Sequence, residues 1–142
     1  MARILAIDYG TKRVGIAVTD PSQMIASGLT AVKTHELLDF LKDYFLKEEV
    51  ESLVIGYPRK MNNTASESFK YIKEFETAFI RRFPDIFVIW VDERFTSSLA
   101  MDAMIRGGMK KKDRQVKENT DKISAAIILQ SYLENKNLKF DK

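Results

Sequence analysis

The sequence predicts an α/β protein in which a five-stranded mixed sheet is flanked by helices. Three short apolar segments near the amino terminus are separated by short links, which favours an antiparallel meander. Two later apolar segments are each entered through a helical pattern, which favours parallel strands at the centre of the sheet. No internal repeat or linker interrupts the 142 residues, so we expect one domain over 1–142.

The expected meander has strands at Arg3–Ile7, Val14–Val18 and Ala26–Val32. The first strand ends in Asp8 and is followed by a turn over 9–13. The second strand stops at Asp20-Pro21, because proline cannot donate a ladder hydrogen bond.

Helices and strands then alternate. Thr34 can cap a helix whose apolar residues recur at helical spacing up to Phe45. The strand Ser52–Ile55 follows and is broken by Gly56-Tyr57-Pro58. A second helix begins at Thr64-Ala65-Ser66-Glu67, which fits a capping box, and it leads to the strand Ile86–Val91.

Two more helices are expected after this strand. One is capped by Thr96 or Ser97, runs to about Ile105 and ends at Gly107-Gly108. The last starts near Asn119-Thr120 and runs to about Asn135. We expect the tail Lys136–Lys142 to be frayed.

Composition excludes several classes of function. The chain has no cysteine, which excludes disulfide scaffolds, thiolate zinc sites and thiol nucleophiles. Its single histidine, His35, excludes histidine-rich metal sites. The first apolar run is too short for a secretory signal and no 18-residue apolar stretch exists, so we expect a soluble cytoplasmic protein.

Charge is distributed unevenly along the chain. The net charge is only +3, but six bases and one acid give +5 over Arg106–Lys117, and six acids with two bases give −4 over Thr34–Glu51. A compact basic stretch favours a polyanion such as nucleic acid as the partner, and the alternative is a solvated loop.

Carboxylates stand at the ends of apolar elements. Asp8 closes the first strand, Asp92 and Glu93 close the last strand, and Asp121 opens the last helix. Such a cluster without histidine suits Mg²⁺ or Mn²⁺. Structural alternatives exist for two of them, since Asp121 could favour the helix dipole and Asp92 could pair with Arg94. Asp8 has no comparable structural explanation.

Four segments in this order resemble motifs of the YqgF (RuvX) family, relatives of the RuvC Holliday-junction resolvases with an RNase H-like fold. They are Ile7–Ala17, Val54–Pro58, Val91–Ser97 and Asp121–Gln130. The resemblance runs from about Ala2 to Leu133, which is nearly the whole chain.

The resemblance implies a metal-dependent endonuclease that acts on structured nucleic acid. Its substrate would be the 5′ end of pre-16S rRNA, in ribosome biogenesis, or a Holliday junction. Asp8, Glu93 and Asp121 would be the catalytic acids and would bind the Mg²⁺ or Mn²⁺ ions, although the residues alone leave Asp92 open as the second ligand. Two such ions can activate water and neutralise the phosphate in phosphodiester hydrolysis.

Several residues are candidates for binding nucleic acid. Lys12, Arg13 and Arg94 lie beside the acids in sequence, where they would contact phosphates or pair with the acids. Thr96 would present a helix amino terminus to a phosphate. Four bases of the basic stretch would bind backbone without reading sequence: Lys110, Lys111, Lys112 and Arg114. The partner is precursor rRNA or branched DNA, and a two-fold homodimer would suit an enzyme that cleaves paired strands.

Two other functions remain open from the sequence. A catalytically inactive nucleic-acid-binding module with the same fold is favoured by the lack of an acid at Gly56-Tyr57-Pro58. Actin-like ATPases and sugar kinases also open with a fragment like Asp8-Tyr9-Gly10-Thr11. They need two related domains around the nucleotide, whereas 142 residues supply one.

Overall fold

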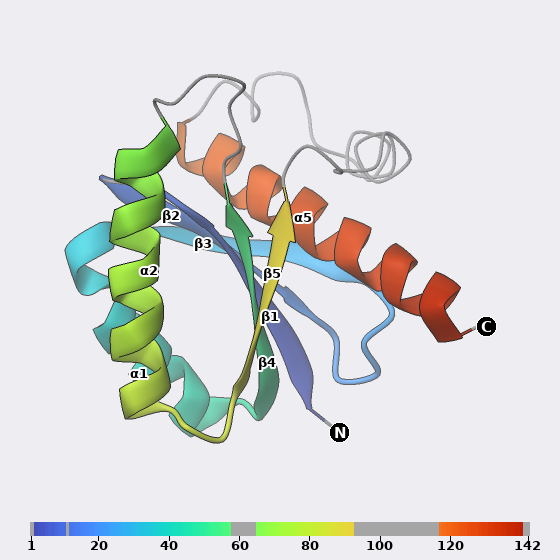
Figure 1. Cartoon of the computed structure of the whole chain (residues 1–142). Coiled ribbons are helices and arrows are strands. Elements are labelled where there is room, and N and C mark those ends of the chain that lie inside the picture. Colours follow the sequence, from blue (N-terminus) through green and yellow to red (C-terminus); the bar gives the residue numbers. More distant parts are fainter. Residues whose placement is uncertain (1, 11, 58–64, 93–116, 141–142) are drawn as a thin grey trace.

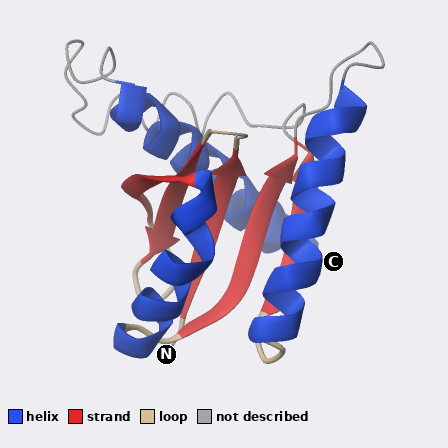
Figure 2. Ribbon diagram, turned by 90° about the vertical axis from the view of Figure 1, so that its left-hand side faces the viewer, coloured by secondary structure: helices blue, strands red, loops and turns tan. Residues whose placement is uncertain are grey.

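The computed structural model describes residues 2–10, 12–57, 65–92 and 117–140. These residues form three layers (Figure 2). A five-stranded sheet lies in the middle, α1 (Leu37–Lys47) and α2 (Ala65–Arg82) cover one face, and α5 (Lys117–Phe140) covers the other. The predicted α/β class is confirmed.

The sheet has the order β3-β2-β1-β4-β5. Its strands are β1 (Arg3–Tyr9), β2 (Arg13–Thr19), β3 (Ala26–Lys33), β4 (Val50–Tyr57) and β5 (Phe87–Asp92). The pairs β1–β2 and β2–β3 are antiparallel, as the short links predict. The pairs β1–β4 and β4–β5 are parallel. The mixed sheet is therefore confirmed, with β1 at its centre.

Alternation along β1 divides the core into two clusters. Leu5 and Ile7 pack on the α1 and α2 side, where Phe75 and Phe79 of α2 also lie. Ile4 and Ala6 point to the other face and pack under α5. Because both faces are covered by helices, β1 and β4 are apolar on both sides, which explains their continuous apolar runs.

β5 is an exception to the expectation of central parallel strands. It pairs with β4 on one side and forms one edge of the described sheet. Phe87, at its start, is 71% exposed, whereas Leu53 in the neighbouring β4 is buried. An apolar sequence indicates that a strand is buried against helices, but it does not indicate the position of the strand in the sheet.

The start of the first helix also differs from the prediction. Thr34 does not cap a helix, because it lies in a short 3₁₀ turn, η1 (Thr34–Glu36), that precedes α1. Its hydroxyl instead donates a hydrogen bond to the carbonyl of Gly10 at 2.7 Å. Its backbone N–H donates to the carbonyl of Lys12 at 3.0 Å. Thr34 therefore anchors the β1–β2 turn.

Two other elements, β4 and α5, are longer than the sequence predicts. β4 continues through Gly56 and Tyr57 rather than breaking there. α5 begins at Lys117 and continues to Phe140, so it starts before and ends after the predicted span from Asn119-Thr120 to about Asn135, and the frayed tail expected from Lys136 stays a prediction. Neither glycine nor proline occurs between 117 and 140, so nothing in the sequence ends the helix at Asn135. The helix expected from Thr96 or Ser97 to about Ile105 lies outside the described residues, and so do Thr64 and the side chains of the predicted capping box.

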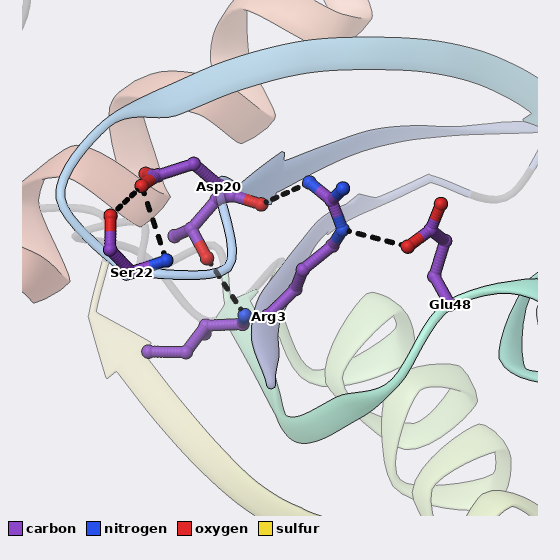
Figure 3. Close-up of polar contacts among 6 residues, drawn as sticks. Arg3, Asp20, Ser22 and Glu48 are labelled. Atoms are coloured by element: carbon purple, nitrogen blue, oxygen red, sulfur yellow. Dashed lines mark hydrogen bonds and ion pairs between the residues drawn. The ribbon is translucent and has the colours of Figure 1, made fainter. Parts of the chain in front are cut away.

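Thr19, at the end of β2, connects the start of β1 to the rest of the sheet (Figure 3). Its buried hydroxyl accepts a hydrogen bond from the backbone N–H of Ile4 at 2.9 Å. Its carbonyl accepts one from Arg3 Nη1, also at 2.9 Å, and Arg3 Nε pairs with Glu48 at 3.2 Å.

We expect Thr19→Val to lower the free energy of unfolding by about 1–3 kcal/mol, because it leaves the buried Ile4 N–H without its acceptor. Urea unfolding measures this loss. Thr19→Ser keeps the hydroxyl and is the matched control. If both variants lost the same stability, the hydrogen bond would not be the cause.

Asp20 organises the turn between β2 and β3. Its carboxylate accepts hydrogen bonds from the hydroxyl and N–H of Ser22 (Figure 3). It also accepts hydrogen bonds from the N–H groups of Met24 and Ile25. The Ser22 hydrogen bond, followed by that of Ile25, holds the pKa of Asp20 well below its usual range.

A lowered pKa in the folded state stabilises the protein above the pKa of the unfolded state, about 3.9, and this stabilisation is lost as the pH falls below it. We therefore expect Asp20→Asn to be less stable than the natural protein at pH 7. The difference should shrink at pH 3. Urea midpoints at the two pH values test this, and a difference that does not change with pH would contradict it.

Candidate active site

Asp8 lies near the carboxyl end of β1, at the centre of the sheet. Its alternation with Ile4 and Ala6 places it on the face covered by α5. Its register partners on both sides are glycines, Gly15 in β2 and Gly56 in β4. The carboxylate therefore has no neighbouring side chain in its own row on either adjacent strand. It is partly buried and lies at the carboxyl ends of the strands, where open α/β folds bind ligands.

The carboxyl ends of β4 and β5 lie at the same edge as Asp8 (Figure 1). Asp8 pairs with Gly56, which pairs with Val91, and Asp92 occupies the next row opposite Tyr57. Two strand spacings separate the Cα atoms of Asp8 and Val91, which is about 10 Å. The structure thus brings the end of β5 to the edge that holds Asp8.

The first turns of α5 lie at the same end of the molecule as the arrowheads of β4 and β5 (Figures 1 and 2). Because α5 begins at Lys117, Asp121 is its fifth residue and does not open the helix as expected. The free N–H groups of a helix belong to its first four residues. Capping or dipole stabilisation is therefore a weaker explanation for Asp121 than the sequence suggests.

Lys12 lies in the link between β1 and β2, and Arg13 is the first residue of β2, directly beside the carboxyl end of β1. Lys12 is exposed and Arg13 is partly buried. A Cβ atom at Gly10 would lie 2.5 Å from the carbonyl oxygen of Arg13, so this turn requires glycine. With Thr34 bonded to its carbonyls, the turn holds these two bases at the edge that carries Asp8.

Thr34 and Gly56 are the residues of this edge whose roles the sequence analysis missed. Thr34 was interpreted as a helix cap and Gly56 as a strand breaker. The signal available for Thr34 was its polar side chain directly after a strand. For Gly56 no local signal could reveal the partner, because the side chain that covers it comes from α5, 72 positions later in the chain.

Tyr9 lies on the opposite face of the same strand end, with its ring 5.4 Å from the ring of Phe75. Burial raises the pKa of Tyr9, and the carboxylate of Glu74 raises it further. Tyr9 therefore stays neutral at physiological pH and packs against α2.

The remaining predicted site residues lie outside the part of the chain that the structure describes in full. Glu93, Arg94, Thr96, Lys110, Lys111, Lys112 and Arg114 are outside the described residues. For Asp92 and Asp121 the backbone is described and the side chain is not. Of the three predicted metal ligands, Asp8 alone has a described side chain.

Within residues 2–10, 12–57, 65–92 and 117–140, no group of three acids or histidines is placed to hold a metal ion. The predicted set, Asp8 with Glu93 and Asp121, offers carboxylate oxygens only. This donor chemistry fits Mg²⁺ or Mn²⁺ and differs from the nitrogen and sulfur ligands typical of zinc.

No described helix is long and apolar enough to cross a membrane.

A family model described as RuvX, Holliday junction resolvase, matches residues 2–135. The chain belongs to the RuvX family. The match covers every described strand and most of α5, including Asp8 and Asp121. The resemblance inferred from the four sequence motifs is therefore confirmed.

Curated RuvX relatives are similar over almost their whole length. A protein of Bacteroides fragilis is 58% identical over 138 residues, which cover 97% of this chain and all of the relative. A protein of Phocaeicola vulgatus is 59% identical over 136 residues, covering 96% and 98% of the two chains. Both are named "Putative pre-16S rRNA nuclease".

Two solved resolvase structures share the fold of this RuvX chain. RuvC of T. thermophilus, in complex with a Holliday junction substrate, superposes with a TM-score of 0.62 at 13% identity, covering 96% of each chain. The resolvase of Fowlpox virus, with Holliday junction DNA, gives a TM-score of 0.53 at 15% identity, covering 94% of this chain and 98% of the other. At these identities the likeness establishes the RNase H-like fold alone.

Proposed function

We propose that this RuvX protein is a metal-dependent endonuclease that hydrolyses phosphodiester bonds in structured nucleic acid. Asp8, Glu93 and Asp121 are its metal-binding acids, with Mg²⁺ or Mn²⁺ as the ion. The observation that carries the proposal is the position of Asp8. Asp8 is a partly buried carboxylate on the central strand, in the same row as Gly15 and Gly56. It lies at the end of the sheet where β4 and β5 also end.

Strand alternation favours Glu93 over Asp92 as the acid contributed by β5. Val91 packs with the cluster under α5, on the face where Asp8 lies, whereas Trp90 packs with the opposite cluster. Position 92 belongs by alternation to the same set as Trp90. Asp92 is thereby disfavoured, which supports Glu93, the acid next in sequence, as the metal ligand.

The chemistry divides between the ions and the chain. Bound divalent ions would supply an activated water and neutralise charge on the scissile phosphate. Asp8 would hold them from the central strand and Asp121 from α5, with Glu93, which follows β5 in sequence, as the third acid. Lys12 and Arg13, on the anchored β1–β2 turn, bind the phosphates that flank the cleaved bond, because Arg and Lys suit phosphate oxygens.

Precursor 16S rRNA, cleaved at its 5′ end, is the substrate we propose. The names of relatives that are 58–59% identical over nearly the whole chain support this choice. Branched DNA is the second candidate, supported by the Holliday junction in the RuvC structure that shares the fold. Ions held by Asp8 and the two bases beside the β1–β2 turn would contact phosphates, and both polymers carry them.

A catalytically inactive binding module is the alternative function. It is favoured by Gly56, because the strand next to β1 has no acid in the row of Asp8. A nuclease must bind divalent ions through Asp8, whereas an inactive module needs none.

Cleavage assays on precursor-rRNA ends and on four-way DNA junctions, run side by side, test the proposal. We expect cleavage of the rRNA precursor that EDTA abolishes and that added Mg²⁺ or Mn²⁺ restores. Cleavage of the junction alone would change the substrate to DNA. Binding of either polymer without cleavage, together with no binding of Mn²⁺ in calorimetry, would favour the inactive module.

A further inference from the structure

α5 packs closely against the sheet at two glycines on different strands. A Cβ atom at Gly56 in β4 would lie 2.4 Å from Cδ1 of Ile128 and 3.0 Å from its Cγ1. A Cβ atom at Gly28 in β3 would lie 3.1 Å from Cγ of Lys122 and 3.2 Å from its carbonyl oxygen. A Cβ atom at Gly56 would require the Ile128 side chain to move, and one at Gly28 would require Lys122 to shift by a few tenths of an ångström, so a methyl group at either position pushes against α5.

The residues between these two contacts are also small. Ala6 of β1 and Ala17 of β2 are buried under the helix, opposite Ala125 and Ala126 of α5. Since interiors are packed as densely as crystals, such a close interface transmits a local displacement and does not absorb it. The two glycine contacts are thus tight points in the packing of α5 on the sheet.

Both contacts are connected to the proposed metal site. Gly56 is the register partner of Asp8. Ile128, which covers Gly56, follows Asp121 by seven residues, which is two helical turns and returns to the same side of the helix. Lys122, which covers Gly28, is the residue directly after Asp121. A shift of α5 at either glycine therefore moves the Asp121 backbone relative to Asp8.

We propose that Gly28 and Gly56, with Ile128, are positioning residues that set the separation between Asp121 on α5 and Asp8 on β1. This inference rests on the proposed function, because it assumes that these two acids share a metal site. Neither glycine touches the metal or the substrate. Each acts through the placement of α5.

Mn²⁺ affinity measured by calorimetry on the full chain tests this without knowledge of the substrate. We expect Gly56→Ala to weaken Mn²⁺ binding on the order of tenfold, the scale of changes in residues that orient metal ligands. Adding Ile128→Val removes the 2.4 Å contact, so the double variant should recover most of the affinity. An effect of residue 56 on Asp8 itself would not be relieved by a change at 128.

Ile72→Val is the control for lost stability, because Ile72 is fully buried on the α1 and α2 side, away from α5. It should bind Mn²⁺ like the natural protein. If Gly56→Ala does not fold, Gly28→Ala is the milder variant, because its closest contacts of 3.1–3.2 Å require a shift of only a few tenths of an ångström. It should still weaken binding.

The outcomes separate the two proposals. Unchanged affinity in Gly56→Ala and Gly28→Ala, a double variant as weak as Gly56→Ala, or an equal loss in Ile72→Val overturns the positioning role and leaves the proposed function standing. A natural protein that binds no Mn²⁺ overturns the proposed metal site, and the positioning role with it.

Discussion

We expect Asp8→Asn to abolish the proposed metal-dependent cleavage by the RuvX protein while leaving its fold intact. Asparagine has almost the same shape as aspartate, so the partly buried position between Gly15 and Gly56 still accommodates it. It lacks the negative charge that would hold the ions. Because changes in residues that only orient metal ligands cost about 10- to 100-fold, we expect loss of the ligand itself to exceed that range.

The rate of cleavage in Mn²⁺ and the urea unfolding midpoint together measure this effect. Asp43→Asn is the matched control, because Asp43 is an exposed acid on α1, on the opposite face of the sheet from the α5 side. It makes the same chemical change and should leave the rate unaltered. Full activity in Asp8→Asn would overturn the metal-site proposal.

We expect that replacing Lys110, Lys111 and Lys112 together with glutamine weakens substrate binding and flattens its dependence on salt. Each base that neutralises a phosphate contributes about 0.9 to the slope of log affinity against log salt on duplex DNA, and about 0.7 on single strands. We therefore expect the slope to fall by up to about 2–3. The three lysines lie outside the described residues, so this prediction comes from the charge pattern of the sequence.

Fluorescence anisotropy from low to moderate salt measures the slope. The matched control neutralises Lys42, Lys47 and Arg82, which are three exposed bases of α1 and α2. It changes the net charge equally, at a distance from Asp8 and the β1–β2 turn. An equal decrease in slope in both variants would mean that total charge, and not the basic stretch, is responsible.

Local patterns predicted most of the secondary structure because they depend on neighbours in the chain. The alternation and apolar runs around Ile7, Ile16 and Ile55 located the strands, and the short links located the meander. Thr34 shows the limit of this approach. Its sequence context fits a helix cap, but the nearby β1–β2 turn offers its hydroxyl a carbonyl acceptor that a local pattern cannot include.

Some features of the candidate site can likewise be predicted from the sequence, and others require the structure. The type and order of its residues could be predicted, since Asp8 at a strand end and Asp121 on the last helix are visible in the sequence. The face on which Asp8 lies required the register of three strands. Asp121 lies in the second turn of α5 because the helix starts at Lys117. The sequence near Lys117 has no glycine or proline that would indicate this start.

By itself the sequence determined the α/β class, the meander, the absence of cysteine and the presence of a single histidine, because composition and periodicity can be read from the chain alone. The acids of the proposed site stay a prediction. The tertiary structure alone decided that β5 forms an edge, that Thr34 anchors a turn and that Ile128 covers Gly56. These features are contacts between residues distant in sequence. They follow from strand order and close packing, which no local pattern encodes.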